Sequence, residues 1–427
     1  MYAYIDAAAD DLSPDTNSGD AALLDVRAAA ETTGHDSSEI DPTVGEMEES
    51  ASQASSAEAV EAVDNNRLEG GAIDAVRTRR GNPVLEEVFG HHQEHDGMAQ
   101  AETPPGLTTP LMVHQKMALG WMLRREEAER VAHTWWEQVD GGLYGFNTPL
   151  WVNLLTGQDR PIDQPPLEAR GGILADDMGL GKTLTILALI VSDLGAPLPP
   201  TASSMAPAAS AGEDSECCQR PTLIVCPLSV LHNWQKQIDS HTNKALRVMI
   251  YHGAGRTRDV QALTHQHIVL TTYSVLQSDM RASRLRDEAG SRASVLHAVH
   301  WHRVVLDEAH VIANPKAKQS KAVMMLQADR RWAVTGTPLQ NKMDDLMTLF
   351  AFLRIEPLDD PEWFRRLVAD PSRSKCPQRQ MEGLQVVRSV LTEYCLRRTK
   401  HQRIHGAPIL SLPGKEEVVR MLNSSRL

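Results

Sequence analysis

The chain has 427 residues, of which 41% are hydrophobic, so its length allows two or three domains with a sizeable core. Its formal net charge at pH 7 is −13, but residues 1–66 alone contain sixteen acidic side chains and one basic side chain, Arg27. The rest of the chain has 42 basic and 40 acidic residues, so the overall acidity does not exclude a surface that binds nucleic acid.

Two further features argue against a secreted or membrane protein. No charged and apolar leader opens the chain, and no apolar run approaches the roughly 18 residues that a membrane span needs. The five cysteines form no C-x-x-C pair and show no zinc-ligand spacing: Cys217, Cys218, Cys226, Cys376 and Cys395. This pattern favours reduced thiols, and we expect a soluble intracellular protein.

Residues 1–80 are rich in Ala, Ser, Asp and Glu and show no sustained hydrophobic period. Such a segment buries too little apolar area to offset the entropy lost on ordering, so we expect a disordered acidic tail. A linker at 81–106 follows, and the pattern of a folded domain begins at Leu107.

Short apolar runs then alternate with helical patterns. The six runs are GGILAD (171–176), TLIVCP (222–227), RVMIYHG (247–253), HIVLTTY (267–273), RVVLDEA (303–309) and RWAVTGT (331–337). Each is mostly apolar on both faces and bounded by turn residues, which is typical of buried parallel strands joined by crossover helices. The expected fold class is α/β, with a doubly wound parallel sheet in one lobe at 107–355.

Two polar insertions interrupt this lobe. We expect the first, at 195–220, to be disordered, and a charged helix is one interpretation of the second, at 281–294. Beyond Ile355 the strand pattern stops, and helical patterns carry residues 356–427 to the end of the chain.

The segment ILADDMGLGKTLT (173–185) joins the first apolar run to a helix. Gly179 and Gly181 allow a tight turn whose N–H groups point inward, and the helix that begins near Lys182 adds its positive dipole. In this pattern Lys182 bridges the β- and γ-phosphates of a nucleotide, and the Thr183 hydroxyl binds Mg²⁺. Asp176 departs from the general pattern, which has glycine at this position, so an ordinary glycine-rich turn remains the alternative.

The segment RVVLDEAH (303–310) favours the nucleotide interpretation. An apolar strand that ends in two carboxylates places Asp307 at the carboxyl end of the sheet, where ligands bind in open α/β folds. Asp307 can hold Mg²⁺, and Glu308 can orient and deprotonate an attacking water. A strand followed by an acidic turn would not explain the Gly-Lys-Thr loop upstream, so we expect ATP and Mg²⁺ as cofactors.

Three further loops follow predicted strands: VCPLSVLHNW (225–234), LTTYSVL (270–276) and VTGTPLQN (334–341). They carry hydroxyl and amide groups where these groups and backbone N–H groups can hold a phosphodiester chain. Considered one at a time, they are equally typical of turns and helix caps.

Together these segments resemble, in the family's order, the first lobe of the Swi/Snf-type helicase-like ATPases of superfamily two, over about Leu107 to Arg420. LMVHQKMALGWM (111–122) is similar to the adenine-reading segment, GGILADDMGLGKTLT (171–185) to motif I and LIVCPLSVLHNW (223–234) to motif Ia. IVLTTY, VVLDEAH and TGTPLQN follow as the next three, and the family commonly has an acidic residue where Asp176 stands. RRWAVTGTPLQNKMDDL (330–346) and LRRTK (396–400) are most similar to the branch containing helicase-like transcription factor and its yeast post-replication repair relatives.

The resemblance implies a DNA-dependent ATPase that translocates on duplex DNA, free or in nucleosomes, in chromatin remodelling or DNA repair in the nucleus. Gln115 would read adenine, against the alternative of a polar residue on a helix surface. The implied nucleotide-binding residues are Asp177, Met178, Gly179, Leu180, Gly181, Lys182, Thr183 and Leu184. Residues implied to couple the nucleotide to DNA are His310, Thr335, Gly336 and Thr337, while Pro227, Ser229, Thr271 and Thr272 would follow one DNA strand. Arg397, Arg398 and Lys400 would lie where the first lobe leads into the second, or they form a solvated basic run.

The sequence departs from the family in two places. Ala313 stands where relatives usually have a basic residue, and nothing like the second lobe's Q-x-x-G-R-x-x-R segment or a RING zinc site is found. Arginine fingers contribute roughly 10³–10⁵ in rate to P-loop enzymes, so we expect this chain alone to hydrolyse ATP barely above background. A non-catalytic fragment that binds ATP, DNA or a partner of the acidic tail is the competing hypothesis. A DEAH-type RNA helicase is disfavoured by DDMGLGKT and TGTPLQN.

Overall fold

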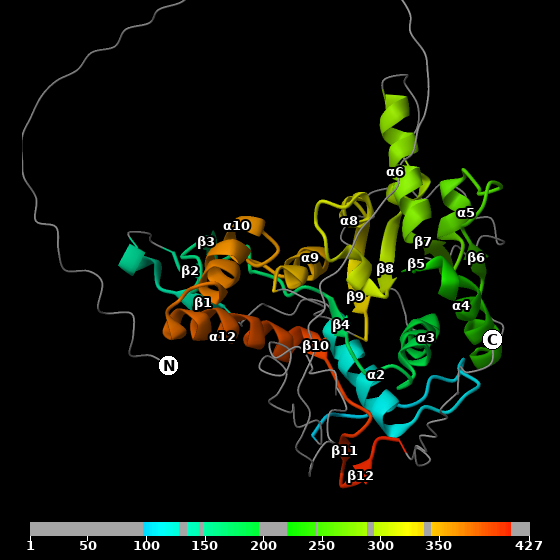
Figure 1. Cartoon of the computed structure of the whole chain (residues 1–427), viewed down its shortest axis with the longest axis horizontal. Helices are drawn as coiled ribbons and strands as arrows, with labels where there is room; N and C mark the ends of the chain where they lie inside the picture. Colours follow the sequence, from blue (N-terminus) through cyan, green and yellow to red (C-terminus); the bar gives the residue numbers. More distant parts are fainter. Residues whose placement is uncertain are drawn as a thin grey trace, which may run out of the picture. The chain divides into compact units, whose positions relative to one another are not determined.

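The computed structural model describes residues 97–127, 135–144, 148–195, 220–243, 246–287, 294–336 and 343–410. All of them belong to one of two compact units, Val76–Leu427 (Figure 1). The predicted acidic tail at 1–80 and most of the insertion at 195–220 lie outside the described residues. In the described part of the chain no helix is long and apolar enough to cross a bilayer, and no group of His, Cys, Asp and Glu could hold a metal ion.

A parallel sheet of seven strands forms the centre of the lobe, in the order β10-β4-β9-β8-β5-β7-β6. Six of its strands are β4 (Gly171–Leu174), β5 (Thr222–Cys226), β6 (Val248–Ile250), β7 (Ile268–Thr272), β8 (His300–Asp307) and β9 (Gln327–Val334). They coincide with the six apolar runs of the sequence, and every pairing among them is parallel. The predicted α/β class with a doubly wound parallel sheet is confirmed.

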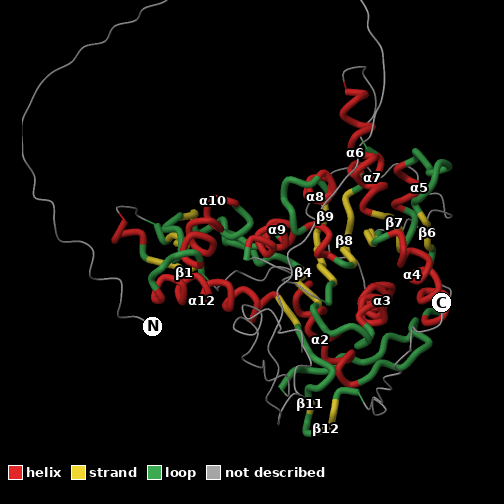
Figure 2. The backbone as a smooth tube through the Cα atoms, in the orientation of Figure 1, coloured by secondary structure: helices red, strands yellow, loops and turns green. Residues whose placement is uncertain are grey.

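Helices cover both faces of this sheet (Figure 2). One face packs against α2 (Val113–Glu126), α3 (Lys182–Ser192) and α4 (Leu228–His241). The other face packs against α6 (Tyr273–Asp287), α7 (Val295–Ala298), α8 (Lys318–Met324), α9 (Asp344–Leu353), α10 (Pro361–Phe364) and α12 (Pro377–Tyr394). Successive strand residues alternate between the two cores, as Ile173 and Leu174 do, because side chains of a strand point to opposite faces. This explains why the runs that predicted the strands are mostly apolar.

The shorter helical elements connect these layers. They are α5 (Val260–Thr264), α11 (Asp370–Ser372), the 3₁₀ helices Gly141–Tyr144, Asp193–Gly195 and Ala309–Ile312, and a π-helical turn at Arg365–Ala369. Helix α6 extends into the second predicted insertion as far as Asp287, so part of that insertion is helical as one interpretation had it.

Sequence analysis missed a small antiparallel sheet between α2 and β4. Its strands are β1 (Trp136–Val139), β2 (Leu150–Asn153) and β3 (Asp159–Pro161). The Arg160 guanidinium lies 4.8 Å from the Trp136 ring centroid and 2.6 Å from a carboxylate oxygen of Glu356. Strands of three or four residues with polar outer positions carry too few alternations to stand out in a sequence.

The strand pattern does not end at Ile355 as predicted. Helices α10 to α12 occupy the expected helical segment, but β10 (Cys395–Leu396) then returns to the sheet and pairs parallel with β4. A hairpin of β11 (Arg403–Ile404) and β12 (Ala407–Pro408) follows. A two-residue strand has no periodicity of its own, so only its place beside β4 identifies β10.

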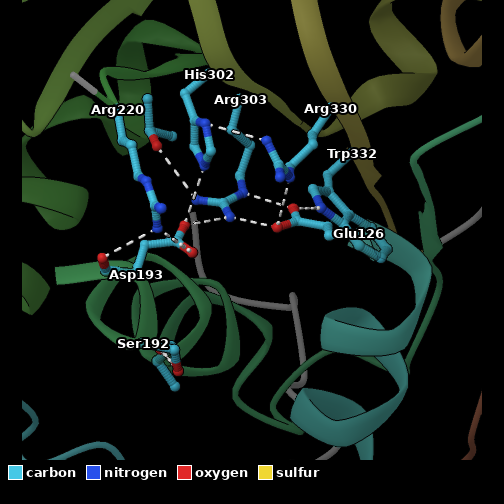
Figure 3. Close-up of polar contacts among 10 residues, drawn as sticks. Glu126, Ser192, Asp193, Arg220, His302, Arg303, Arg330 and Trp332 are labelled. Atoms are coloured by element: carbon cyan, nitrogen blue, oxygen red, sulfur yellow. Dashed lines mark hydrogen bonds and ion pairs between the residues drawn. The ribbon is translucent and has the colours of Figure 1, made fainter. Parts of the chain in front are cut away.

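Toward the amino ends of the central strands, charged side chains form a buried network (Figure 3). Arg303 on β8 is fully buried and binds both carboxylate oxygens of Glu126, at the end of α2, with a distance of 2.6 Å from Nε to Oε1. It also donates to Asp193 Oδ2 at 2.7 Å, just after α3. The Trp332 indole donates to Glu126 Oε1 at 2.6 Å. The network therefore ties the ends of α2 and α3 to the middle of the sheet.

Candidate active site

The loop between β4 and α3 has the backbone conformation that its glycines allow. Gly179 and Gly181 have φ angles of 89° and 80°, in the left-handed region that side chains disfavour, and Gly181 is the N-cap of α3. A Cβ atom at Gly181 would also lie 2.2 Å from Gln115 Nε2. The loop therefore wraps the N-terminus of α3, whose N–H groups and dipole favour an anion.

Lys182 is the first residue of α3, and its ammonium folds back onto this loop. Its Nζ donates to the carbonyl oxygens of Asp176 at 2.7 Å and Asp177 at 3.3 Å. Burial lowers the pKa of Lys182, and the nearby carboxylates, including those of Asp307 and Glu308, oppose this shift. A phosphate that reached the loop would meet a half-buried cation held by two neutral carbonyl partners. The adjacent Thr183 and Leu184 are partly buried in the first turn of α3.

The two carboxylates of the DEAH segment lie at the carboxyl end of β8. Asp307 Oδ2 accepts a 2.7 Å hydrogen bond from the Trp234 indole, and Oδ1 accepts from the Glu308 N–H at 3.0 Å. Burial raises the pKa of Asp307, and the Trp234 hydrogen bond works against that shift. The Tyr273 hydroxyl donates to the Asp307 carbonyl at 2.8 Å. Trp234 of α4 and the Glu308 N–H thus fix the orientation of the carboxylate, while Tyr273 of α6 holds the backbone of Asp307.

Glu308 leaves the strand in a left-handed conformation, with φ of 50°. Its Oε2 lies 3.2 Å from His310 Nδ1, and both side chains are 31% exposed. A carboxylate that is partly accessible and beside an imidazole is suited to accept a proton from water. Ala313, which caps the end of the 3₁₀ helix Ala309–Ile312, accepts a hydrogen bond at its carbonyl from the Thr348 hydroxyl on α9.

The loop after β9 reaches the same place. Thr335 is buried, and its N–H donates to the Leu174 carbonyl at 3.1 Å. A Cβ atom at Gly336 would lie 3.3 Å from Met178 and 4.0 Å from Lys182 Nζ. Gly336 therefore abuts the phosphate loop, while Thr337 lies outside the described residues.

Gln115 is buried rather than on a helix surface, which rules out the alternative given for it. Its Oε1 accepts from the Met112 N–H at 2.9 Å, and its Nε2 donates to the Leu180 carbonyl at 3.3 Å. His114 Nε2 donates to the same carbonyl at 3.0 Å. The start of α2 thus braces the phosphate loop at Leu180, and the reading of adenine by Gln115 stays a prediction.

The predicted DNA-facing residues divide into two pairs. Pro227 is the N-cap of α4, and the next turn exposes Ser229 at the surface. Thr271 and Thr272 are buried, and their hydroxyls bond the Tyr251 carbonyl at 3.0 Å and Ser274 Oγ at 3.1 Å. The structure therefore places only the first pair where a DNA backbone could touch side chains.

Sequence analysis missed the role of Arg398. It is buried, not part of a solvated basic run, and its guanidinium pairs with both carboxylate oxygens of Asp176. The signal was Asp176 itself, because an acidic residue in a buried loop needs a cationic partner. Trp234, which holds Asp307, was quoted in motif Ia without a role, and nothing in the sequence marks it as a neighbour of β8.

Comparison with known proteins agrees with this architecture. The SNF2-related domain matches residues 114–427. A putative SWI/SNF-related matrix-associated actin-dependent regulator of chromatin subfamily A member 3-like 1 from Arabidopsis thaliana is 36% identical over 344 residues, which are 73% of this chain and 36% of that protein. DNA repair protein RAD5B of the same plant is 34% identical over 337 residues, covering 74% and 25% of the two chains. Helicase-like transcription factor of Mus musculus is 29% identical over 475 residues, covering 80% and 45%.

A solved structure also resembles the chain. The Sulfolobus solfataricus SWI2/SNF2 ATPase core in complex with dsDNA is 27% identical, with a TM-score of 0.47, over 71% of this chain and 47% of that one. The chain spans between a quarter and a half of the length of the relatives that it matches.

Proposed function

Because the chain belongs to the SNF2-related domain family, we propose that it binds ATP with Mg²⁺ as the first lobe of a DNA-dependent ATPase. One observation carries this proposal. The structure gathers Lys182, Asp307, Glu308 and Gly336, from three separate segments, around the N-terminus of α3. This is the edge of an open α/β sheet at which ligands bind.

The residues fit the cofactors in their chemistry. The phosphate loop at 176–181 would hold the phosphates through backbone N–H groups, and Lys182 would exchange its two carbonyl partners for phosphate oxygens. The Thr183 hydroxyl and the Asp307 carboxylate are hard oxygen donors, which Mg²⁺ prefers. When bound, the ion would neutralise charge that develops on the phosphates.

Glu308 is the candidate general base. It would orient and deprotonate the attacking water, while Trp234 and Tyr273 keep the neighbouring Asp307 in place. His310 lies beside Glu308, and Gly336 lies against the phosphate loop. Together with Thr335, these residues would couple ATP binding and hydrolysis to the DNA-binding surface.

Duplex DNA is the proposed partner, in DNA repair or chromatin remodelling in the nucleus. Support comes from relatives named for DNA repair and chromatin regulation. Pro227 and the exposed Ser229 would contact phosphate rather than bases. Such binding depends on salt and carries little sequence preference.

Nucleotide binding by the full chain tests this function, with a fluorescent ATP analogue in the presence of Mg²⁺. Lys182→Ala should weaken binding by about 10- to 100-fold, since hydrogen bonds to charged groups contribute about 1.5–3 kcal/mol. The exposed Lys375 gives a matched control, and Lys375→Ala should bind like the wild type. Equal affinity of wild type and Lys182→Ala would refute the site.

Turnover is measured separately, with and without duplex DNA. Glu308→Gln should keep ATP affinity within about twofold and remove the low DNA-stimulated hydrolysis expected of this chain alone, as expected for a general base. Tight binding with no hydrolysis on any duplex would instead favour the non-catalytic ATP- and DNA-binding alternative.

A further inference from the structure

The segment after β10 runs alongside the phosphate loop. The Leu396 carbonyl accepts from the Ala175 N–H at 2.8 Å, and the Arg398 carbonyl accepts from the Asp177 N–H at 2.9 Å. The Lys400 N–H in turn donates to Asp177 Oδ2 at 3.0 Å. The segment 396–400 is therefore hydrogen-bonded at every second residue to the start of the loop.

Arg398 fixes this arrangement from the inside. Its side chain and that of Asp176 are 0% and 3% exposed, and its backbone N–H also donates to Asp176 Oδ1 at 3.0 Å. The same guanidinium donates to the His114 carbonyl, at the start of α2. A buried ion pair with satisfied hydrogen bonds is costly to break, so the backbone leading to Lys400 has little freedom.

The chain beyond Lys400 is held as well. Ile404 and Ile409, in the hairpin β11–β12, pack with Met117 of α2 and Leu180 of the phosphate loop in one apolar cluster. Lys400 thus lies between Arg398 and the apolar cluster of Ile404 and Ile409, and both of these contact the phosphate loop.

The Lys400 ammonium faces the loop at Gly179. A Cβ atom at Gly179 would lie 3.5 Å from Lys400 Cε and 3.6 Å from its Nζ. The side chain is half-buried, and among the described residues no carboxylate lies within ion-pair distance of Nζ. The structure thus holds a cation against an anion-binding loop, without an ion-pair partner in the part of the chain that it describes.

We propose that Lys400 is a second phosphate-binding cation of this site. It would act beside Lys182, although the two lysines lie far apart in the sequence. The proposal rests on ATP being the ligand of the loop. Its ligand class is a polyphosphate, because Lys400 approaches the glycine turn and not Gln115, where the base is expected.

Two substitutions test this in the full chain. Lys400→Met keeps the aliphatic stem and removes the charge, and Lys400→Gln removes the charge but keeps a polar end. Lys400→Arg retains the charge, and Lys375→Met is the matched control at an exposed lysine. Each variant is checked by thermal unfolding, and the Kd is measured for Mg·ATP and for inorganic tripolyphosphate as a competitor.

Both neutral variants should bind ATP and tripolyphosphate about five- to tenfold more weakly, because a partly exposed charge-assisted contact contributes less than a buried one. Lys400→Arg and Lys375→Met should stay within about twofold of the wild type. If either Lys400→Met or Lys400→Gln fails to fold, the other still tests the loss of charge.

Unchanged affinity of both neutral variants, with Lys182→Ala still defective, would overturn the role of Lys400 and leave the proposed ATP site standing. A loss confined to ATP, with tripolyphosphate unaffected, would also overturn it, since Lys400 would then act on the nucleoside. If the wild type bound neither ligand, the proposed function itself would fail.

Discussion

Replacing Arg303 with methionine should destabilise the lobe strongly while leaving the nucleotide site untouched. The guanidinium is fully buried and binds two carboxylates, those of Glu126 and Asp193, with a weaker contact to the Thr222 hydroxyl at 3.4 Å. Methionine fills much of the same volume but leaves both acids without their main partner. Breaking a buried pair in this way costs about 3–5 kcal/mol.

The structure favours the lower end of that range. Arg330 Nε remains 3.4 Å from Glu126 Oε2, and Arg220 Nη1 remains 3.6 Å from Asp193 Oδ1, so each acid keeps a secondary cation. A loss of about 3 kcal/mol corresponds to a fall in Tm of about 6–10 °C for a lobe of this size.

Thermal unfolding followed by circular dichroism measures this fall, with Arg373→Met as the control. Arg373 pairs with Asp344 on the surface, where the two side chains are 61% and 45% exposed, so its removal should change the free energy of unfolding by less than about 1 kcal/mol. If Arg303→Met lowered Tm no more than Arg373→Met, the reasoning about the buried network would be wrong. ATP affinity below the transition should be the same in both variants.

Three further outcomes are expected. Burial raises the pKa of Asp193, but the Arg303 guanidinium outweighs burial and holds that pKa well below its usual range. The ionised Asp193 therefore stabilises the fold above about pH 4, and this stabilisation is lost as pH falls further. Asp193→Asn should flatten the acid side of the plot of Tm against pH, and a curve parallel to that of the wild type would contradict the assignment. Gly181→Ala should weaken ATP binding at least about tenfold, whereas Gly157→Ala, with φ of 69° and open space around the added methyl, should cost only about 1 kcal/mol of stability. Trp234→Phe removes the indole donor from the Asp307 carboxylate, so the pKa of Asp307 should rise further. Mg²⁺-dependent ATP binding should then weaken relative to the wild type, and more so as pH falls, as magnesium titrations over a series of pH values would show.

The sequence predicted the parts of the fold that carry a local pattern. All six of these strands overlap the apolar runs that predicted them, since a strand buried on both faces is mostly apolar. The strands β1–β3 and β10 have between two and four residues, so they are specified by their partners rather than by their own pattern.

The same distinction holds for the site. Lys182 and Asp307 could be predicted because each stands in a contiguous motif at the end of a strand. Trp234 could not, because it acts across 73 positions of the chain. Asp176 indicated that a cationic partner was needed, but not that Arg398, 222 positions away, supplies it. Thr271 and Thr272 were assigned to DNA from the family resemblance, but a matching motif does not reveal which of its side chains the sheet buries.

The return of β10 to the sheet determines how a growing chain can complete this lobe. Until Leu396 has left the ribosome, β10 cannot pair with β4. The apolar strand Gly171–Leu174 is then an edge strand, whose backbone groups on one side have no partner strand. An unpaired apolar edge invites pairing with other chains, so fragments that stop within α12 should aggregate. A soluble fragment of this lobe should therefore include at least Lys400, because only then are the sheet edge covered and the phosphate loop anchored.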